Sequence, residues 1–134
     1  MNMIVGDYEI KEGLKYTKEH EWIEIVGDII SIGVTDYASK EMGDVAFIEL
    51  PEEGRHVGKG ELLCEIESVK AVSEVLSPVD GSIVDSNGEL EDMPEMINEA
   101  PYDSWIVKVR YDKMPEGLLS DSEYRSLIED LQKN

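Results

Sequence analysis

Residues 64–81 read CEIESVKAVSEVLSPVDG. Apolar, strand-like segments run into and out of a short stretch of small residues, with one lysine, Lys70, between them. This pattern predicts a β-hairpin that holds a single amine at its tip. An amine at such a tip suits presentation to other proteins, whereas a lysine used inside a pocket needs different surroundings. We therefore predict that Lys70 is covalently modified and carried between partners.

The residues around Lys70 argue against a catalytic lysine. A lysine side chain is protonated at neutral pH and is then a poor nucleophile. The neighbouring acids Glu67 and Glu74 favour the charged form further, which disfavours a Schiff-base or general-base role. An enzyme that brings an activated acyl group and its own base can still modify such a lysine. The pattern by itself equally fits an ordinary solvated lysine.

Composition indicates one small domain that spans residues 1–134. With 134 residues and 41% hydrophobic content, the chain can form a single core. No apolar run is long enough to cross a membrane, and the N-terminal residues lack the features of a secretory signal or a transit peptide. One cysteine rules out an intramolecular disulfide and fits a reducing compartment. We expect a cytoplasmic protein without a membrane partner.

The charge balance excludes one large class of partner. The chain has 31 acidic residues against 12 basic ones, a net charge of −19. Nucleic-acid binding requires the opposite balance, because its affinity comes largely from neutralised phosphates. Two interpretations stay open: high solubility in a demanding habitat, and steering of an acidic protein toward basic patches on its partners.

Short strand signals dominate the middle of the chain. We expect a hairpin over 21–34, then a short helix from the cap Thr35 to Met42, with Gly43 as a left-handed C-cap. Further strands are predicted at 45–50, 82–85 and 105–111, and Asp92 is predicted to cap a helical turn over 94–97. Many short strands with glycine-rich turns favour a barrel or sandwich.

The two ends of the chain differ from this pattern. Ser120 and Glu123 have the spacing of a capping box, and apolar residues follow at helical spacing, which predicts an amphipathic helix over 119–132. The N-terminal extension, 1–12, fits either an added edge strand or a frayed end.

Several motifs together resemble one known family. The run Glu67-Ser68-Val69-Lys70-Ala71, followed by acidic Glu74 and by Ser77-Pro78-Val79-Asp80-Gly81, resembles the lipoyl-attachment segment of the glycine cleavage system H proteins. Other motifs of that family follow in order from Leu14 to Leu131: residues 16–23, 32–38, 42–45, 49–54, 94–98, 101–105 and 118–124.

The resemblance implies a mainly β fold, the lipoyl/biotinyl-type hybrid barrel-sandwich of two sheets, with short helices and a C-terminal amphipathic helix. It implies a carrier that is not itself an enzyme and has no catalytic residue. Lipoate would be attached covalently to Lys70, within the motif Glu67, Ser68, Val69 and Ala71. The arm would take an aminomethyl group from glycine decarboxylase (the P protein) to the aminomethyltransferase (the T protein).

The resemblance also implies further partners and contacts. Dihydrolipoamide dehydrogenase (the L protein) would reoxidise the arm, and a lipoate ligase, or an octanoyltransferase with lipoyl synthase, would install it. The carrier is expected to be a monomer. Glu21 and Glu74 match acidic positions of the family and are predicted to contact the aminomethyl arm, although both also fit solvated acids. Glu19 replaces a small hydroxyl residue, and Asp103-Ser104 is a shortened loop.

The remaining candidate residues favour structural roles. His20 and His56 lie far apart without metal-ligand spacing, so no metal site is expected. A structural hydrogen bond is expected for His20, and a buried, inert thiol for Cys64. No phosphate-binding glycine loop or nucleophile elbow is present.

Two alternatives to a glycine cleavage carrier remain. An H-like lipoate-relay protein, serving other lipoate-dependent complexes, would use the same Lys70. A lipoyl or biotinyl domain detached from a larger enzyme would normally lack the Glu67–Ala71 context, the opening His20-Glu21-Trp22 motif and the C-terminal helix; biotin carriers usually place methionines beside the lysine.

Overall fold

A computed structural model describes residues 2–133. Met1, the first residue of the predicted 1–12 extension, lies outside this range. The elements are β1 (Asn2–Val5), β2 (Tyr8–Lys11), β3 (Lys15–Tyr16), β4 (Glu21–Val26), β5 (Ile29–Val34), α1 (Asp36–Met42), β6 (Val45–Glu49), β7 (His56–Val57), β8 (Leu62–Ser68), β9 (Val72–Leu76), β10 (Gly81–Ser86), α2 (Glu89–Asp92), α3 (Met96–Glu99), β11 (Val107–Tyr111) and α4 (Asp121–Leu131).

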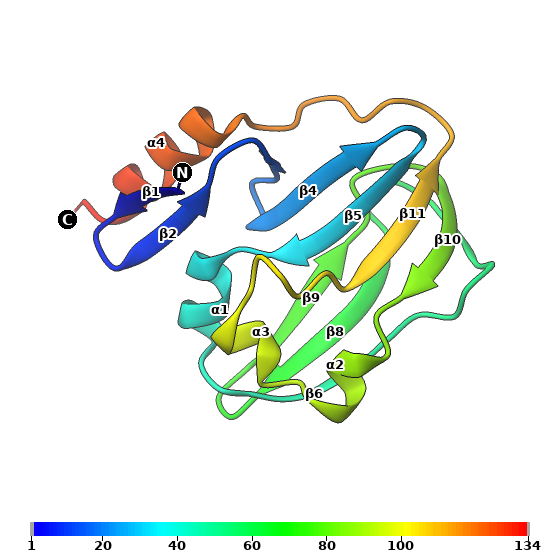
Figure 1. The fold of residues 1–134 in the computed structure, drawn as a ribbon, viewed down its shortest axis with the longest axis horizontal. Coiled ribbons are helices and arrows are strands. Elements are labelled where there is room, and N and C mark those ends of the chain that lie inside the picture. The colour runs from blue at the N-terminus through cyan, green and yellow to red at the C-terminus, as the bar shows by residue number, and fades with distance from the viewer. Residues whose placement is uncertain (1, 134) are drawn as a thin grey trace.

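The strands form three antiparallel sheets. A six-stranded sheet has the order β3-β4-β5-β11-β10-β7, and a three-stranded sheet has the order β6-β8-β9. The hairpin of β1 and β2 forms a separate two-stranded sheet beside α4 (Figure 1). The prediction of a mainly β fold with short helices and a C-terminal helix is confirmed, while the third sheet was not expected.

The main core lies between the six-stranded and the three-stranded sheet. Ile23 and Ile32 face it from β4 and β5, and Ile48 and Ile66 face it from β6 and β8. Each of these side chains is at most 1% exposed. Ile48 and Ile66 each lie between exposed neighbours, because successive side chains of a strand point to opposite faces. Cys64 is buried in this core, as the sequence predicts.

A second core joins the two ends of the chain. Val5 and Ile10 from the N-terminal hairpin pack with Tyr124 and Ile128 of α4. The ring of Tyr124 also stacks on Tyr16, with centroids 4.4 Å apart and planes 4° apart. Residues 2–11 therefore form a docked hairpin, which is neither an edge strand of the main sheets nor a frayed end.

The C-terminal helix confirms the predicted capping box. Ser120 Oγ accepts from the Glu123 amide at 3.1 Å, and Glu123 Oε1 accepts from the Ser120 amide at 2.8 Å. The helix is shorter than the predicted 119–132, because Leu119 pairs in extended conformation with Tyr16 through two backbone hydrogen bonds.

Three local predictions were wrong in detail. Asp92 ends α2 instead of capping the next helix, and α3 begins at Met96 with Glu95 at the N-cap. The last strand begins at Val107, two residues later than predicted. Gly43 has the expected positive φ of 80°, but its ψ of −164° is extended, because the chain turns there directly into β6.

The second core generates a stability prediction. Ile10→Ala should lower the free energy of unfolding by about 2–5 kcal/mol, because Ile10 is 1% exposed and its removal leaves a cavity. Ile4→Ala in the same hairpin should change it by no more than about 0.5 kcal/mol, because Ile4 is 64% exposed. Chemical denaturation measures both, and equal effects would show that the hairpin does not pack as described.

Candidate functional site

The predicted hairpin is present, and Ser68 closes its tip. β8 and β9 pair up to Glu67 and Val72, and the Ser68 amide donates to the Ala71 carbonyl at 2.9 Å. Ser68 Oγ accepts from the amides of Lys70 and Ala71, at 3.3 and 3.1 Å. A two-residue loop, Val69-Lys70, is thus held by one serine, whose short polar side chain bonds readily to nearby backbone.

Lys70 lies at the tip with its side chain exposed. It forms no ion pair with any carboxylate of residues 2–133. Its aliphatic stem passes close to Gly43, where a Cβ atom would lie 3.3 Å from Lys70 Cε. The amide of its neighbour Val69 donates to the Asp44 carbonyl at 3.0 Å. The tip is therefore anchored by its backbone while the amine stays accessible.

A cleft of about 260 Å³ opens beside the tip, between β9 and α1. We call it the tip cleft. Its lining residues come from the turn before β4, from β5, from α1 and from β9: Glu19, His20, Glu21, Val34, Tyr37, Ala38, Glu41, Met42, Ala71, Ser73, Glu74 and Val75. Four carboxylates and an apolar floor thus lie within reach of the hairpin tip.

Glu21 is the buried carboxylate of this group. It is 2% exposed, and its Oε2 accepts from the Leu76 amide of β9 at 2.8 Å. Its Oε1 accepts from the Thr17 hydroxyl at 3.2 Å, and Thr17 Oγ1 in turn accepts from the Glu21 amide at 3.1 Å. Burial raises the pKa of Glu21 to about 7, although the two hydrogen bonds oppose the rise. Glu21 therefore ties β4 to β9 and is only partly ionised at neutral pH.

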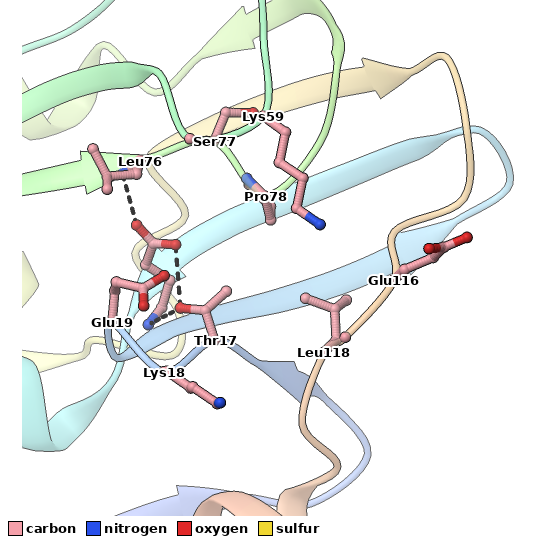
Figure 2. A pocket seen from close by; sticks show the side chains of 12 residues that line it. Thr17, Lys18, Glu19, Lys59, Leu76, Ser77, Pro78, Glu116 and Leu118 are labelled. Carbon is pink, nitrogen blue, oxygen red and sulfur yellow. Dashed lines mark hydrogen bonds between the residues drawn. The ribbon is translucent and has the colours of Figure 1, made fainter.

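Glu21 also borders a second hollow, on the other side of the same turn (Figure 2). Its volume is about 290 Å³. Figure 2 shows Lys59 and Pro78 on one wall of this hollow, and Thr17 and Leu118 on another. Glu21 thus lines both hollows, and both of its carboxylate oxygens have partners from the chain.

The other predicted site residues divide between two faces. Glu74 is exposed on β9 and lines the tip cleft, opposite Glu65 of β8. Ala71 lines the cleft as well. Glu67 lies away from it, in a hollow on the outer face of the three-stranded sheet that Phe47 also lines. Glu21, Ala71 and Glu74 therefore line one cleft next to the Lys70 loop, whereas Glu67 lines the other hollow.

The sequence does not predict that α1 forms a wall of the tip cleft. Tyr37, Ala38, Glu41 and Met42 have the spacing of one face of a helix, which was the available signal. The N-terminal hairpin supports this wall from behind. Tyr8 donates to Glu41 Oε2 at 3.0 Å, and its ring lies 4.8 Å from that of Tyr37.

His20 makes the structural hydrogen bond that the sequence predicts. Its Nδ1 lies 2.8 Å from the hydroxyl of Tyr124, which lies 2.7 Å from Thr35 Oγ1. Its φ of 69° places it in the left-handed region, where non-glycine residues are uncommon. Burial lowers its pKa, which keeps the imidazole neutral at neutral pH.

Two other kinds of site find no support in the described part of the chain. Residues 2–133 contain no group of three or more His, Cys, Asp or Glu side chains placed to hold a metal ion. None of the described helices combines the length and the apolar character needed to span a membrane.

Comparisons with known proteins converge on one family. The family model described as "Glycine cleavage H-protein" matches residues 14–131. The chain is 56% identical over 122 residues to the "Probable glycine cleavage system H protein" of Pyrococcus abyssi, covering 89% of this chain and 91% of that protein. It is 53% identical over 131 residues to its counterpart in Thermococcus gammatolerans, covering 95% and 98%. A crystal structure of a glycine cleavage system H protein from Mycobacterium marinum is similar, with a TM-score of 0.82 and 36% identity over 89% of this chain and 98% of that one.

The buried carboxylate generates a pH prediction. The pKa of Glu21 is higher in the folded chain, about 7, than its ordinary value of 4.5, so its contribution to stability is fully present below about pH 4.5 and is lost as the pH rises through about 7. Glu21→Gln does not titrate. The wild-type chain should therefore lose up to about 3 kcal/mol relative to Glu21→Gln between pH 5 and pH 8.

Denaturant unfolding at several pH values measures this difference. The control is Glu24→Gln, which removes an exposed carboxylate from the same strand and should give a constant difference from wild type. If the Glu21→Gln and wild-type curves run parallel as well, the carboxyl group is not buried as described.

Proposed function

This chain belongs to the glycine cleavage H-protein family, whose members are non-catalytic carriers of the glycine cleavage system, and we propose that Lys70 is its point of lipoyl attachment. The observation that carries the proposal is the hairpin tip. Lys70 is exposed, free of any ion pair within residues 2–133, and held by a loop that Ser68 closes. When bound, the lipoyl group supplies a disulfide that can open to take up an aminomethyl group and close again on oxidation.

The residues of the hairpin would fit this role in two ways. An exposed lysine side chain gives reach, since four methylene groups separate its amine from the backbone. The short loop would fix the position of the Lys70 backbone, because Ser68 and the Val69–Asp44 hydrogen bond restrain the loop. We propose that Ser68, Val69 and Ala71 form the frame that a lipoate ligase, or an octanoyltransferase with lipoyl synthase, recognises, and that Glu67 contributes from the outer face.

The tip cleft is proposed to hold the carried amine. An aminomethyl group carries an amine that is cationic near neutral pH, and carboxylates attract it. Glu74 and Glu41 are exposed on opposite walls and supply this charge. Glu21 would act at shorter range, from a position where both of its oxygens already accept hydrogen bonds. The apolar residues of the floor, Val34 and Met42, would limit the access of water.

We propose that the loaded chain visits the P protein, the T protein and the L protein in turn. The net charge of −19 supports encounter with basic patches on these enzymes, with faster association at low salt. The alternative, a lipoate relay to other complexes, would use the same lysine. Glycine–bicarbonate exchange with the cognate P protein separates the two, because only a glycine cleavage carrier supports it.

The attachment site is tested by intact mass. The chain produced with lipoate and a lipoate ligase should gain one lipoyl group, and Lys70→Arg should gain none, because arginine cannot form the amide. Lys59→Arg is the control, since it also removes an exposed lysine and should be modified like wild type. Modification of Lys70→Arg, or none on the wild-type chain, would contradict the proposal.

The role of the cleft is tested through Glu74. Glu74→Gln should shorten the lifetime of the carried amine about two- to fivefold at low salt, the range expected for one exposed charge pair, and 1 M salt should reduce the difference. Release of ammonia from the loaded chain measures it. Glu91→Gln removes an exposed carboxylate from α2, outside the tip cleft, and should have no effect. Equal effects of both changes would point to net charge rather than to the cleft.

A further inference from the structure

The side chain of Asn98 connects α3 to the corner where α1 passes into β6. Its Oδ1 accepts from the Val45 amide at 2.8 Å, and its Nδ2 donates to the Gly43 carbonyl at 2.9 Å. One amide group thus satisfies both a donor and an acceptor of the segment 43–45, which we call the corner. Asparagine suits this task because it presents a donor and an acceptor from the same planar group.

The corner is also fixed from the side of α1. Asn98 Nδ2 lies 3.3 Å from Ser39 Oγ, and Ser39 Oγ donates to the Ile97 carbonyl at 3.0 Å. Ser39 is 1% exposed. The last turn of α1 and the short helix α3 are therefore joined by polar side chains that leave little freedom for the corner between them.

The corner in turn holds the hairpin tip. Its Asp44 carbonyl accepts from the Val69 amide at 3.0 Å, which makes it a hydrogen-bond partner of the tip backbone from outside the hairpin. Gly43 lies against the stem of Lys70, where a Cβ would stand 3.3 Å from Lys70 Cε. The chain of contacts thus runs from Asn98 to the corner and from the corner to Val69 and Lys70.

The strand ladder alone leaves this region weakly defined. β6 pairs with β8 through Val45 and Ser68, but the register shifts between Val45 and Phe47. A bulge of this kind interrupts the ladder locally and bends the strand. The hydrogen bond from the Val45 amide to Asn98 lies outside this ladder and adds a second restraint on the end of β6 next to the tip.

From these contacts we propose that Asn98 is a positioning residue for the modification of Lys70. It acts through the corner, which sets where the Val69-Lys70 loop stands when the lipoate-attaching enzyme binds. The proposal rests on the proposed function only in taking Lys70 as the attachment point. A displaced loop reduces the rate of acyl transfer because the amine must meet the activated acyl group in a narrow range of geometries.

The test compares Asn98 with another partly buried asparagine. Asn87 Nδ2 donates to the Trp105 carbonyl at 2.8 Å, in the connection after β10, and does not contact the corner. Apo chains are lipoylated by a lipoate ligase with lipoate and ATP, at a temperature well below the midpoint of thermal unfolding of each variant. We expect kcat/KM for Asn98→Ala to fall about tenfold and that for Asn87→Ala to stay within about twofold of wild type.

Asn98→Asp keeps the acceptor for Val45 and loses the donor to Gly43, so its kcat/KM should lie between those of wild type and Asn98→Ala. It also serves as the main variant if Asn98→Ala folds poorly. Hydrogen exchange of the Val69 amide in the apo chain gives a second readout, and it should accelerate in both Asn98 variants and not in Asn87→Ala.

The positioning role of Asn98 would be contradicted if its variants kept the wild-type kcat/KM and the wild-type exchange rate of the Val69 amide. That result would leave Lys70 as the attachment site. Equal losses in Asn98→Ala and Asn87→Ala would overturn the positioning role too, because they would report general destabilisation. A wild-type chain that accepts no lipoate would overturn the attachment site and this inference together.

Discussion

The fold depends on how the two edge strands of the three-stranded sheet are hydrogen-bonded to the rest of the chain. β6 and β9 each have a single neighbour, β8, so their outward backbone groups need partners from elsewhere in the chain. Buried donors without a partner would cost about 1–3 kcal/mol each. Asn98 accepts from Val45 on one edge, and Glu21 accepts from Leu76 on the other. Two polar side chains thereby fix the sheet that carries Lys70 onto the rest of the fold.

This constraint explains why a carrier of this kind needs a full fold around one lysine. The amine itself has no arranged partner within residues 2–133, and the order lies in the backbone beneath it and in the cleft wall opposite. Tyr8 and Tyr37 extend that order outward, since the N-terminal hairpin braces α1 from behind. Under the proposed function, the chemistry would belong to an attached group and to partner enzymes, and the chain would contribute the attachment point, the charge and the cleft.

The sequence predicts the features that depend on local signals. The hairpin around Lys70, the capping box of Ser120 and the buried Cys64 each follow from residues within one element. Contacts that close over long distances were not predictable: Glu21 meets a backbone amide 55 residues away, and Asn98 one 53 residues away. Local signals also failed where neighbours competed. Asp92 looked like a cap but ends α2, and the N-terminal hairpin formed because α4, over 100 residues later, covers its apolar side chains.

That last pairing has a consequence for biosynthesis. The turn of the N-terminal hairpin touches the far end of the chain, where the side chain of Gln132 lies against Gly6. Val5 and Ile10 leave the ribosome more than 100 residues ahead of Tyr124 and Ile128. At about 5–20 residues per second, the apolar face of the hairpin waits roughly 6 to 25 seconds for its cover. The main sheets can meanwhile assemble from residues already made, so the two cores become complete in a fixed order, with the one that joins the chain ends closing last.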